Sequence, residues 1–168
     1  MTRALRPWLL AAAMFLSPAL AAAATPTEIG RFDDWTAYTL DDPSGKICYI
    51  VSEPTQQRGD YTRRGDPYAL VTNRPAANIA GEVSLVAGYP FRPDSTPTAE
   101  IGNQRFRFYA DGDTAWVLRE EEKGLLDAMR RGMTMTVRGT SARGTDTTDT
   151  YSLRGITAAL KAIDGECR

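Results

Sequence analysis

The sequence of 168 residues contains no histidine. This absence excludes catalytic triads that depend on an imidazole, zinc sites with imidazole ligands, and pH switches based on histidine. An excess of one charge sign is also missing, because 20 lysines and arginines face 21 aspartates and glutamates. A chain with this balance has no overall electrostatic attraction for nucleic acid. We therefore do not expect nucleic acid among its partners.

Long hydrophobic runs are missing after the N-terminus. Residues 9–16 (LLAAAMFL) follow Arg3 and Arg6, and small residues that fit the A-x-A cleavage pattern come next. The apolar run is too short to cross a bilayer as a helix, which favours a cleavable Sec signal peptide over 1–24 rather than a membrane anchor. We expect 25–168 to be one exported domain without a membrane span, in the periplasm or, alternatively, at the surface or secreted.

Cysteine is scarce, since the chain has only Cys48 and Cys167. Two cysteines in an exported chain most simply form one disulfide, and the alternative is a pair of free buried thiols. A bridge across so long a loop contributes about 4–5 kcal/mol in the chain-entropy model. Such a bridge would tie the C-terminal end of the domain to its beginning.

What the chain does contain is a series of short segments rich in β-branched and aromatic residues, separated by turn residues. Strands are expected at 34–40, 46–52, 68–73, 82–89, 98–101, 104–109, 114–119 and 133–138, with a last one around Tyr151 and Leu153. Helices are expected at 120–131 and from Ile156 to a stop at Gly165, where the apolar residues recur with helical spacing. The segments 22–30, 53–67 and 143–150 look like loops or turns. These features predict a mainly β fold, an antiparallel β-sandwich or flattened barrel with two short helices, the second at the C-terminus.

Six stretches carry a resemblance to a known family. They are DWTAYTL from Asp34, KICYIVSEP around Cys48, YALVTNRP from Tyr68, EVSLVAGYPF from Glu82, FYADGDTAW from Phe108, and the tail from Gly139 to Cys167 with its S-L-x-G step and T-A-A-L helix. Over Asp34 to Cys167 the chain resembles the invasion-associated locus B family of exported bacterial proteins. The resemblance implies a β-sandwich of the periplasm or cell envelope without established enzymatic activity. It supplies no catalytic residues or cofactors, and it implies Cys48 and Cys167 as a structural bridge.

Acidic motifs offer several candidate sites. Arg58-Gly59-Asp60 and Arg64-Gly65-Asp66 both match the integrin-recognition tripeptide, although a solvated loop explains them more simply. Asp111-Gly112-Asp113 resembles the start of a calcium loop but lacks its later ligands, so a hairpin turn is preferred. Asp146 and Asp149 are a candidate carboxylate pair for glycan hydrolysis, although a role in capping turns is the simpler interpretation.

Arginines and aromatics complete the set of candidates. A basic face that would contact anionic lipopolysaccharide or peptidoglycan is formed, in this interpretation, by Arg105, Arg107, Arg138, Arg143 and Arg154. Solubilising strand arginines are the alternative. The predicted core contains Trp35, Trp116, Phe106 and Phe108.

The sequence thus favours a non-enzymatic envelope protein that binds another protein or an envelope polymer. The alternatives are a histidine-free hydrolase that uses paired carboxylates and a surface-exposed factor for host-cell adhesion or invasion.

Overall fold

The computed structural model describes residues 25–167; the expected signal peptide at 1–24 lies outside them. The strands are β1 Thr27–Phe32, β2 Trp35–Asp42, β3 Gly45–Ser52, β4 Gln56–Gly59, β5 Tyr68–Arg74, β6 Ile79–Val86, β7 Thr98–Ile101, β8 Gln104–Asp111, β9 Thr114–Val117, β10 Thr134–Thr140 and β11 Asp146–Ser152. The helices are α1 Glu122–Arg131 and α2 Ile156–Glu166, with a short 3-10 turn at Pro75–Ala77.

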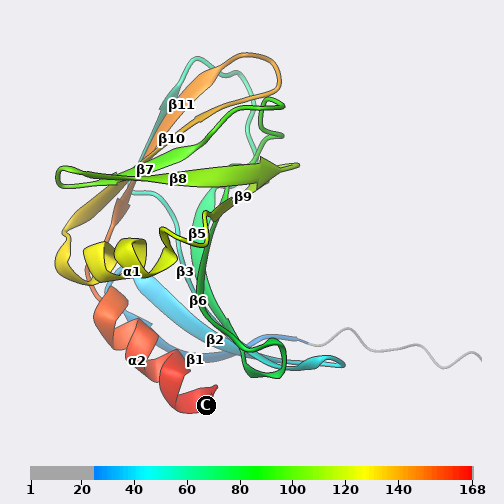
Figure 1. Ribbon diagram of the computed structural model, residues 1–168, viewed down its shortest axis with the longest axis vertical. Helices are drawn as coiled ribbons and strands as arrows, with labels where there is room; N and C mark the ends of the chain where they lie inside the picture. Colours follow the sequence, from blue (N-terminus) through cyan, green and yellow to red (C-terminus); the bar gives the residue numbers. More distant parts are fainter. Residues whose placement is uncertain (1–24, 168) are drawn as a thin grey trace, which may run out of the picture.

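All strands belong to one antiparallel 11-stranded sheet in the order β1-β2-β3-β5-β6-β9-β8-β7-β10-β11-β4. The sheet curves strongly, and α1 and α2 lie together on one side of it (Figure 1). The prediction of a mainly β, antiparallel fold with two short helices, the second at the C-terminus, is confirmed. Neighbouring strands pair mostly through short hairpins, which explains why the turn residues were visible in the sequence.

The curvature brings the two halves of the sheet together at the start of β2. Trp35 is fully buried there, and its indole Nε1 donates a hydrogen bond to the carbonyl oxygen of Ser152 at the end of β11, at 3.0 Å. The backbone amide of Asp34 donates to the carbonyl oxygen of Arg154 beside it. These contacts close one corner of the sheet around the apolar core.

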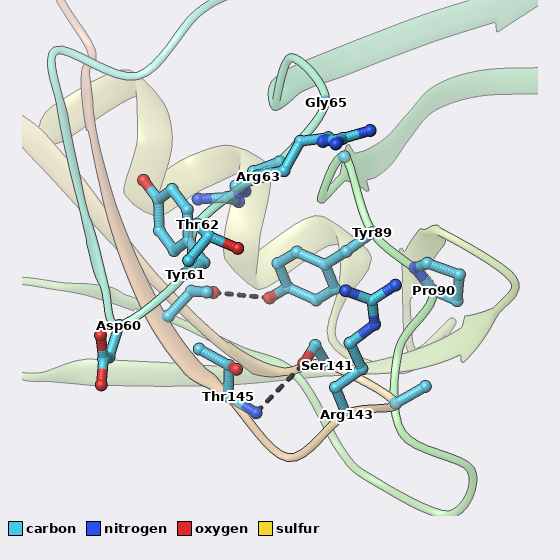
Figure 2. A pocket seen from close by; sticks show the side chains of 14 residues that line it. Asp60, Tyr61, Thr62, Arg63, Gly65, Tyr89, Pro90, Ser141, Arg143 and Thr145 are labelled. Atoms are coloured by element: carbon cyan, nitrogen blue, oxygen red, sulfur yellow. Dashed lines mark hydrogen bonds between the residues drawn. The ribbon is translucent and has the colours of Figure 1, made fainter.

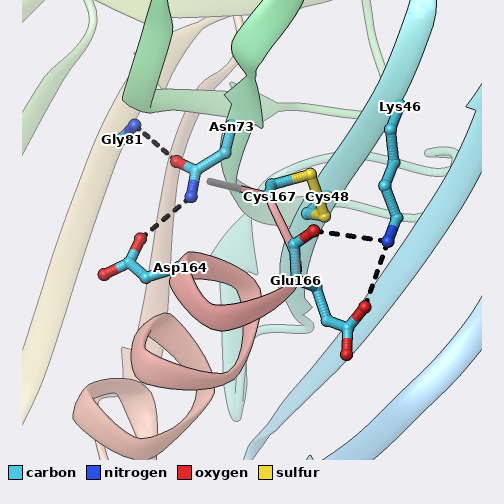
Figure 3. Close-up of a disulfide and its surroundings, with 7 residues drawn as sticks. All are labelled: Lys46, Cys48, Asn73, Gly81, Asp164, Glu166 and Cys167. Atoms are coloured by element: carbon cyan, nitrogen blue, oxygen red, sulfur yellow. Dashed lines mark hydrogen bonds and ion pairs between the residues drawn. A yellow bond between two sulfur atoms is a disulfide. The ribbon is translucent and has the colours of Figure 1, made fainter.

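Helix α2 covers the inner face of β1, β2 and β3. Its four residues at helical spacing are all buried, as predicted: Ile156, Ala159, Leu160 and Ile163. Directly after the helix, Cys167 forms a disulfide with Cys48 of β3, with 5.9 Å between their Cα atoms (Figure 3). The predicted bridge is therefore present, and it holds the end of the chain against the third strand.

A buried asparagine supports the same helix from its other side. Asn73 of β5 is 3% exposed, and its amide Nδ2 donates to the carboxylate of Asp164 at 2.9 Å. Its carbonyl oxygen accepts from the backbone amide of Gly81 in β6 at 2.8 Å. Figure 3 shows that this link and the disulfide flank the last turns of α2.

Two strands were missed in the sequence, and a third was placed too late. β1 and β4 fall in segments expected to be loose or looped. The last strand, expected around Tyr151 and Leu153, is β11, and it begins at Asp146, within the predicted 143–150 turn. β1 and β4 are the two edges of the sheet, and such strands show little hydrophobic alternation because only one neighbour and partial burial specify them. The buried positions of β11 are Thr147, Asp149 and Tyr151, so only the last of them has the large apolar side chain that marks a buried strand face.

The aromatic core set needs one correction. Trp35, Phe106 and Phe108 are buried as predicted. Trp116 of β9 instead lies half-buried and stacks on Tyr109 of β8, with ring centroids 5.6 Å apart. Tyr109 is 54% exposed, so this pair sits on the solvent side of the sheet and not in the core.

No helix in the described part of the chain, 25–167, has the length and apolar character needed to cross a membrane.

Candidate ligand-binding cleft

A cleft of about 810 Å³ opens beside the β10–β11 end of the sheet (Figure 2). Three segments line it: the chain after β4 at 60–65, the chain after β6 at 88–90, and the β10–β11 connection within 141–147. The walls combine two tyrosines, two exposed arginines and several hydroxyl groups. This volume falls in the range usual for sites that bind small molecules.

Backbone hydrogen bonds fix the three segments to one another. The amide of Gly65 donates to the carbonyl oxygen of Gly88 at 2.9 Å, and the amide of Ala142 donates to the carbonyl oxygen of Pro90 at 2.8 Å. Gly88 has a φ of 71°, and a Cβ on it would stand 2.2 Å from the carbonyl oxygen of Gly65. Only glycine permits this close approach, so Gly88 allows the 60–65 and 88–90 segments to meet at the cleft.

A buried ion pair between Arg64 and Asp149 holds the 60–65 segment against β11 beside the cleft. The guanidinium of Arg64 donates two parallel hydrogen bonds to the carboxylate of Asp149 on β11, at 2.7 and 2.6 Å. Its Nε donates to the carbonyl oxygen of Ala87 at 2.7 Å. The side chains of Arg64 and Asp149 are 3% and 5% exposed. Such bidentate geometry satisfies both charges internally, so neither is available to a ligand.

Two tyrosines enclose the Arg64 guanidinium. Its central carbon lies 5.6 Å from the ring centroid of Tyr61 and 5.0 Å from that of Tyr89, within cation–π range. Burial by itself would lower the pKa of Arg64, but the hydrogen bonds and negative charge of Asp149 outweigh it and raise the pKa above its usual value. The arginine therefore stays charged under all ordinary conditions.

Tyr89 lines the cleft, and contacts with its neighbours fix its position. Its hydroxyl shares a hydrogen bond with the hydroxyl of Thr147 at 2.5 Å, and its ring meets the edge of Phe91 at a centroid distance of 5.4 Å. Burial raises the pKa of Tyr89, while the bond to Thr147 acts in the opposite direction. The phenol is therefore neutral at physiological pH and presents a rigid, half-buried ring.

The charges that remain for a ligand are those of Arg63 and Arg143. Both are exposed, and within 25–167 neither forms an ion pair. In Figure 2 Arg143 extends toward Tyr89 and Pro90, whereas Arg63 runs along the opposite rim. Asp60 also lines the cleft, which leaves a small positive excess. Arg92 flanks the turn at Gly144, just outside the lining.

The five arginines of the predicted basic face do not form one surface. Arg105 and Arg107 of β8 and Arg138 of β10 do share the solvent side of adjoining strands, on either side of β7. Arg105 and Arg138 both pair with Glu100, and Arg107 pairs with Glu121. Arg154 pairs with Asp33 beyond β11, and Arg143 lines the cleft. Four of the five thus have carboxylate partners, and Arg143 has none among the described residues.

The candidate carboxylate pair is separated by the strand itself. Asp149 points inward to Arg64, while Asp146 is exposed and accepts a hydrogen bond from the hydroxyl of Thr140. Residues three apart in a strand face opposite sides, so the two carboxylates do not converge. Asp149 is also not a turn cap, because it lies within β11.

The two integrin-type tripeptides differ in the exposure of their arginines. In the second, the Arg64 guanidinium is buried against Asp149 and is withheld from solvent. In the first, Arg58 and Asp60 are exposed at the end of the edge strand β4. Asp111-Gly112-Asp113 forms the β8–β9 hairpin turn that its sequence indicated.

Sequence reasoning missed the Arg64–Asp149 pair and therefore the cleft. A signal for it exists: Thr147, Asp149 and Tyr151 alternate along one face of β11, and all three are buried. An aspartate at an inward position requires a buried cation, but nothing in the sequence indicates which arginine supplies it. The partner is 85 residues away, in a segment without a periodic pattern.

Comparison with known proteins places the chain in a family. Residues 35–164 match the family described as Invasion associated locus B (IalB) protein, nearly the whole span over which the resemblance was expected. No curated protein and no solved structure matches the chain. The match covers most of the sequence and all of the cleft, so the protein belongs to the invasion-associated locus B family.

Proposed function

We propose that the protein acts in the bacterial cell envelope by binding and not by catalysis, and that the cleft receives an anionic group of an envelope polymer. The observation that carries this proposal is that two arginines of the cleft, Arg63 and Arg143, have no carboxylate partner within 25–167. They lie in a rigid cleft lined with tyrosine and hydroxyl groups. Family membership and the disulfide suggest an exported protein. The periplasm is the compartment that we propose.

A binding role also agrees with how the acidic groups are used. Asp149 is neutralised by Arg64, and Asp146 faces the other side of β11. Glycan hydrolysis by paired carboxylates needs two acidic groups on either side of one bond. The cleft instead offers cations and hydroxyls, which suit recognition of an anion.

The test is cosedimentation of the mature protein with purified peptidoglycan sacculi and with lipopolysaccharide vesicles. We expect binding to at least one polymer, loss of most binding in a variant with Arg63→Gln and Arg143→Gln, and weakening by salt because the attraction is electrostatic. The matched control is Arg138→Gln, which removes an arginine from the opposite side of the sheet where Glu100 accompanies it. Equal binding of the double variant and the wild type would contradict the proposal, and so would release of soluble sugar fragments.

The adhesion alternative now depends on the first tripeptide alone, because Arg64 is buried. Its test is attachment of host cells to immobilised protein. If adhesion is the function, changing Asp60 and Asp66 to glutamate abolishes attachment, and Asp60→Glu alone accounts for the whole effect.

A further inference from the structure

The cleft also indicates which kind of anion it receives, an inference that rests on the proposed function. The lining contains two unpaired arginines and one carboxylate, Asp60. Binding of a polyanion such as polyphosphate relies on a run of cations that tracks successive charges. Two arginines are too few for such a run, and one of them is enough to bind a single anionic group attached to a larger uncharged body.

The uncharged body would meet the Tyr89 ring. This ring cannot turn aside, because Arg64 lies behind it at 5.0 Å, Phe91 contacts its edge, and Thr147 holds its hydroxyl. A Cβ on Gly139 would lie 2.8 Å from that hydroxyl, so the neighbouring backbone approaches closely as well. A fixed aromatic ring with one face toward a cleft is a platform for stacking, and the C–H face of a pyranose is a partner of suitable shape and polarity.

Two threonine hydroxyl groups share the cleft with this ring. The hydroxyls of Thr62 and Thr145 line the cleft, and within 25–167 neither hydroxyl makes a hydrogen bond to the protein. Each can donate one hydrogen bond and accept two. Free hydroxyls in the same cleft as an aromatic ring can exchange hydrogen bonds with the hydroxyls of a sugar, and Arg143 extends toward Tyr89 (Figure 2).

From these features we infer that the cleft binds a sugar that carries a single anionic group, with its pyranose ring on Tyr89 and its carboxylate or phosphate on Arg143, assisted by Arg63. A cleft of about 810 Å³ holds a short saccharide and not a long stretch of polymer. Two envelope sources supply this chemistry: the amino sugar of peptidoglycan whose lactyl carboxylate is free once its stem peptide has been removed, and the phosphorylated amino sugars of lipopolysaccharide.

Calorimetric titration of the mature protein with a matched set of small ligands tests this inference. N-acetylglucosamine is the neutral sugar, N-acetylmuramic acid adds a carboxylate to it, and N-acetylglucosamine 1-phosphate adds a phosphate. Lactate and inorganic phosphate are the same anions without the sugar, and adenosine monophosphate is an anion with a different ring. We expect one of the two charged sugars to bind at least about tenfold more tightly than the neutral sugar and than every anion without a sugar. Which charged sugar binds more tightly distinguishes the peptidoglycan source from the lipopolysaccharide source.

Variants separate the two halves of the ligand. Arg143→Gln should weaken the charged sugar at least about tenfold and leave the neutral sugar unchanged. Tyr89→Leu should weaken all the sugars, whereas Tyr89→Phe, which keeps the ring, should retain them. Arg138→Gln is the control that changes neither. Melting curves of each variant, recorded beside the titrations, show that the cleft is still folded.

Outcomes that overturn the inference differ from those that overturn the proposed function. Inorganic phosphate or lactate binding as tightly as the charged sugars, or adenosine monophosphate binding more tightly, refutes sugar recognition but leaves anion binding in place. Sedimentation with a polymer while no charged sugar binds has the same consequence. Failure to sediment with either polymer contradicts the proposed function itself.

Discussion

Arg64 and Asp149 join two segments that lie 85 residues apart, and their charges are almost completely removed from solvent. A buried ion pair is not in itself a large source of stability, because desolvation offsets most of the attraction. Removal of only one of the two residues is much more destabilising, since the remaining charge is then buried without a partner. The pair therefore makes the position of the 60–65 segment, and with it the cleft wall, sensitive to single substitutions.

Removal of one partner should be strongly destabilising. We expect Asp149→Ala to lower the free energy of unfolding by about 3–5 kcal/mol, measured by urea denaturation. The double variant Arg64→Met, Asp149→Leu should recover most of this loss because no charge remains buried. The control is Asp127→Ala in α1, whose partner Arg130 is largely exposed, where a change below about 1 kcal/mol is expected. An Asp149→Ala variant no less stable than this control would show that the pair is not effectively buried.

Tyr151 makes the stability of the fold depend on pH. It is 1% exposed on β11, and burial raises its pKa well above the ordinary value near 10. Because the folded state holds the proton more tightly than the unfolded state does, this contribution is complete below about pH 10 and is lost as the pH rises above it. Raised pKa values at Tyr89 and Tyr49 act in the same direction.

The measurement is thermal unfolding between neutral and strongly alkaline pH. The wild type should lose stability steeply above about pH 10, and Tyr151→Phe should make that slope shallower. Tyr109→Phe, at a ring that is 54% exposed, is the control and should leave the slope unchanged. Identical slopes for wild type and Tyr151→Phe would refute the assignment.

Among the elements, α2 and its attachments were the most predictable. The i, i+3, i+4, i+7 spacing of its apolar residues identified both the helix and its buried face. Gly165 was expected to stop the helix, but the helix continues to Glu166. The difference is small because a glycine near a helix end adds little strain when the following residue is tied down, here through the Cys167 disulfide.

The cleft could not be predicted in the same way, for a physical reason. Its walls come from connections whose shape depends on contacts between distant backbones, such as Gly65 with Gly88 and Ala142 with Pro90. Period-2 and period-3.6 patterns report burial within one element and carry no information about which connections meet. Arg143 was named as an anion-binding candidate, but only the structure separates it from the four arginines that have carboxylate partners.

The disulfide supports α2 as an element, so its loss should affect stability and leave ligand recognition intact. We expect Cys167→Ser to lower the free energy of unfolding by about 2–5 kcal/mol, with a lower melting temperature and unchanged binding in the cleft. Lys46→Gln, which removes the exposed ion pair to Glu166 and the hydrogen bond to its carbonyl oxygen, is the control for this end of the helix. A Cys167→Ser variant with an unchanged melting temperature would refute the structural role of the bridge.

For the molecule as a whole, cleavage of a signal peptide before residue 25 stays a prediction. In the described part, 25–167, β1 starts at Thr27 and pairs with β2, so cleavage near Ala24 would leave the strands of that part intact. Export would also account for the disulfide, which forms readily outside the cytoplasm. We therefore predict cleavage, export and oxidation as linked events, and one experiment tests all three.

Mass spectrometry of the protein recovered from the periplasmic fraction of its native host is that experiment. We expect a chain that begins at Ala22 or Thr25, with a mass lower by two hydrogen atoms than the dithiol form. Reduction should restore those two hydrogens, and a Cys48→Ser, Cys167→Ser variant should show no change on reduction. A chain that retains Met1 would contradict cleavage of the signal peptide, because the N-terminal segment would then still be attached. A dithiol mass in the periplasmic fraction would instead contradict the bridge, since the compartment oxidises cysteines that lie as close as Cys48 and Cys167 do.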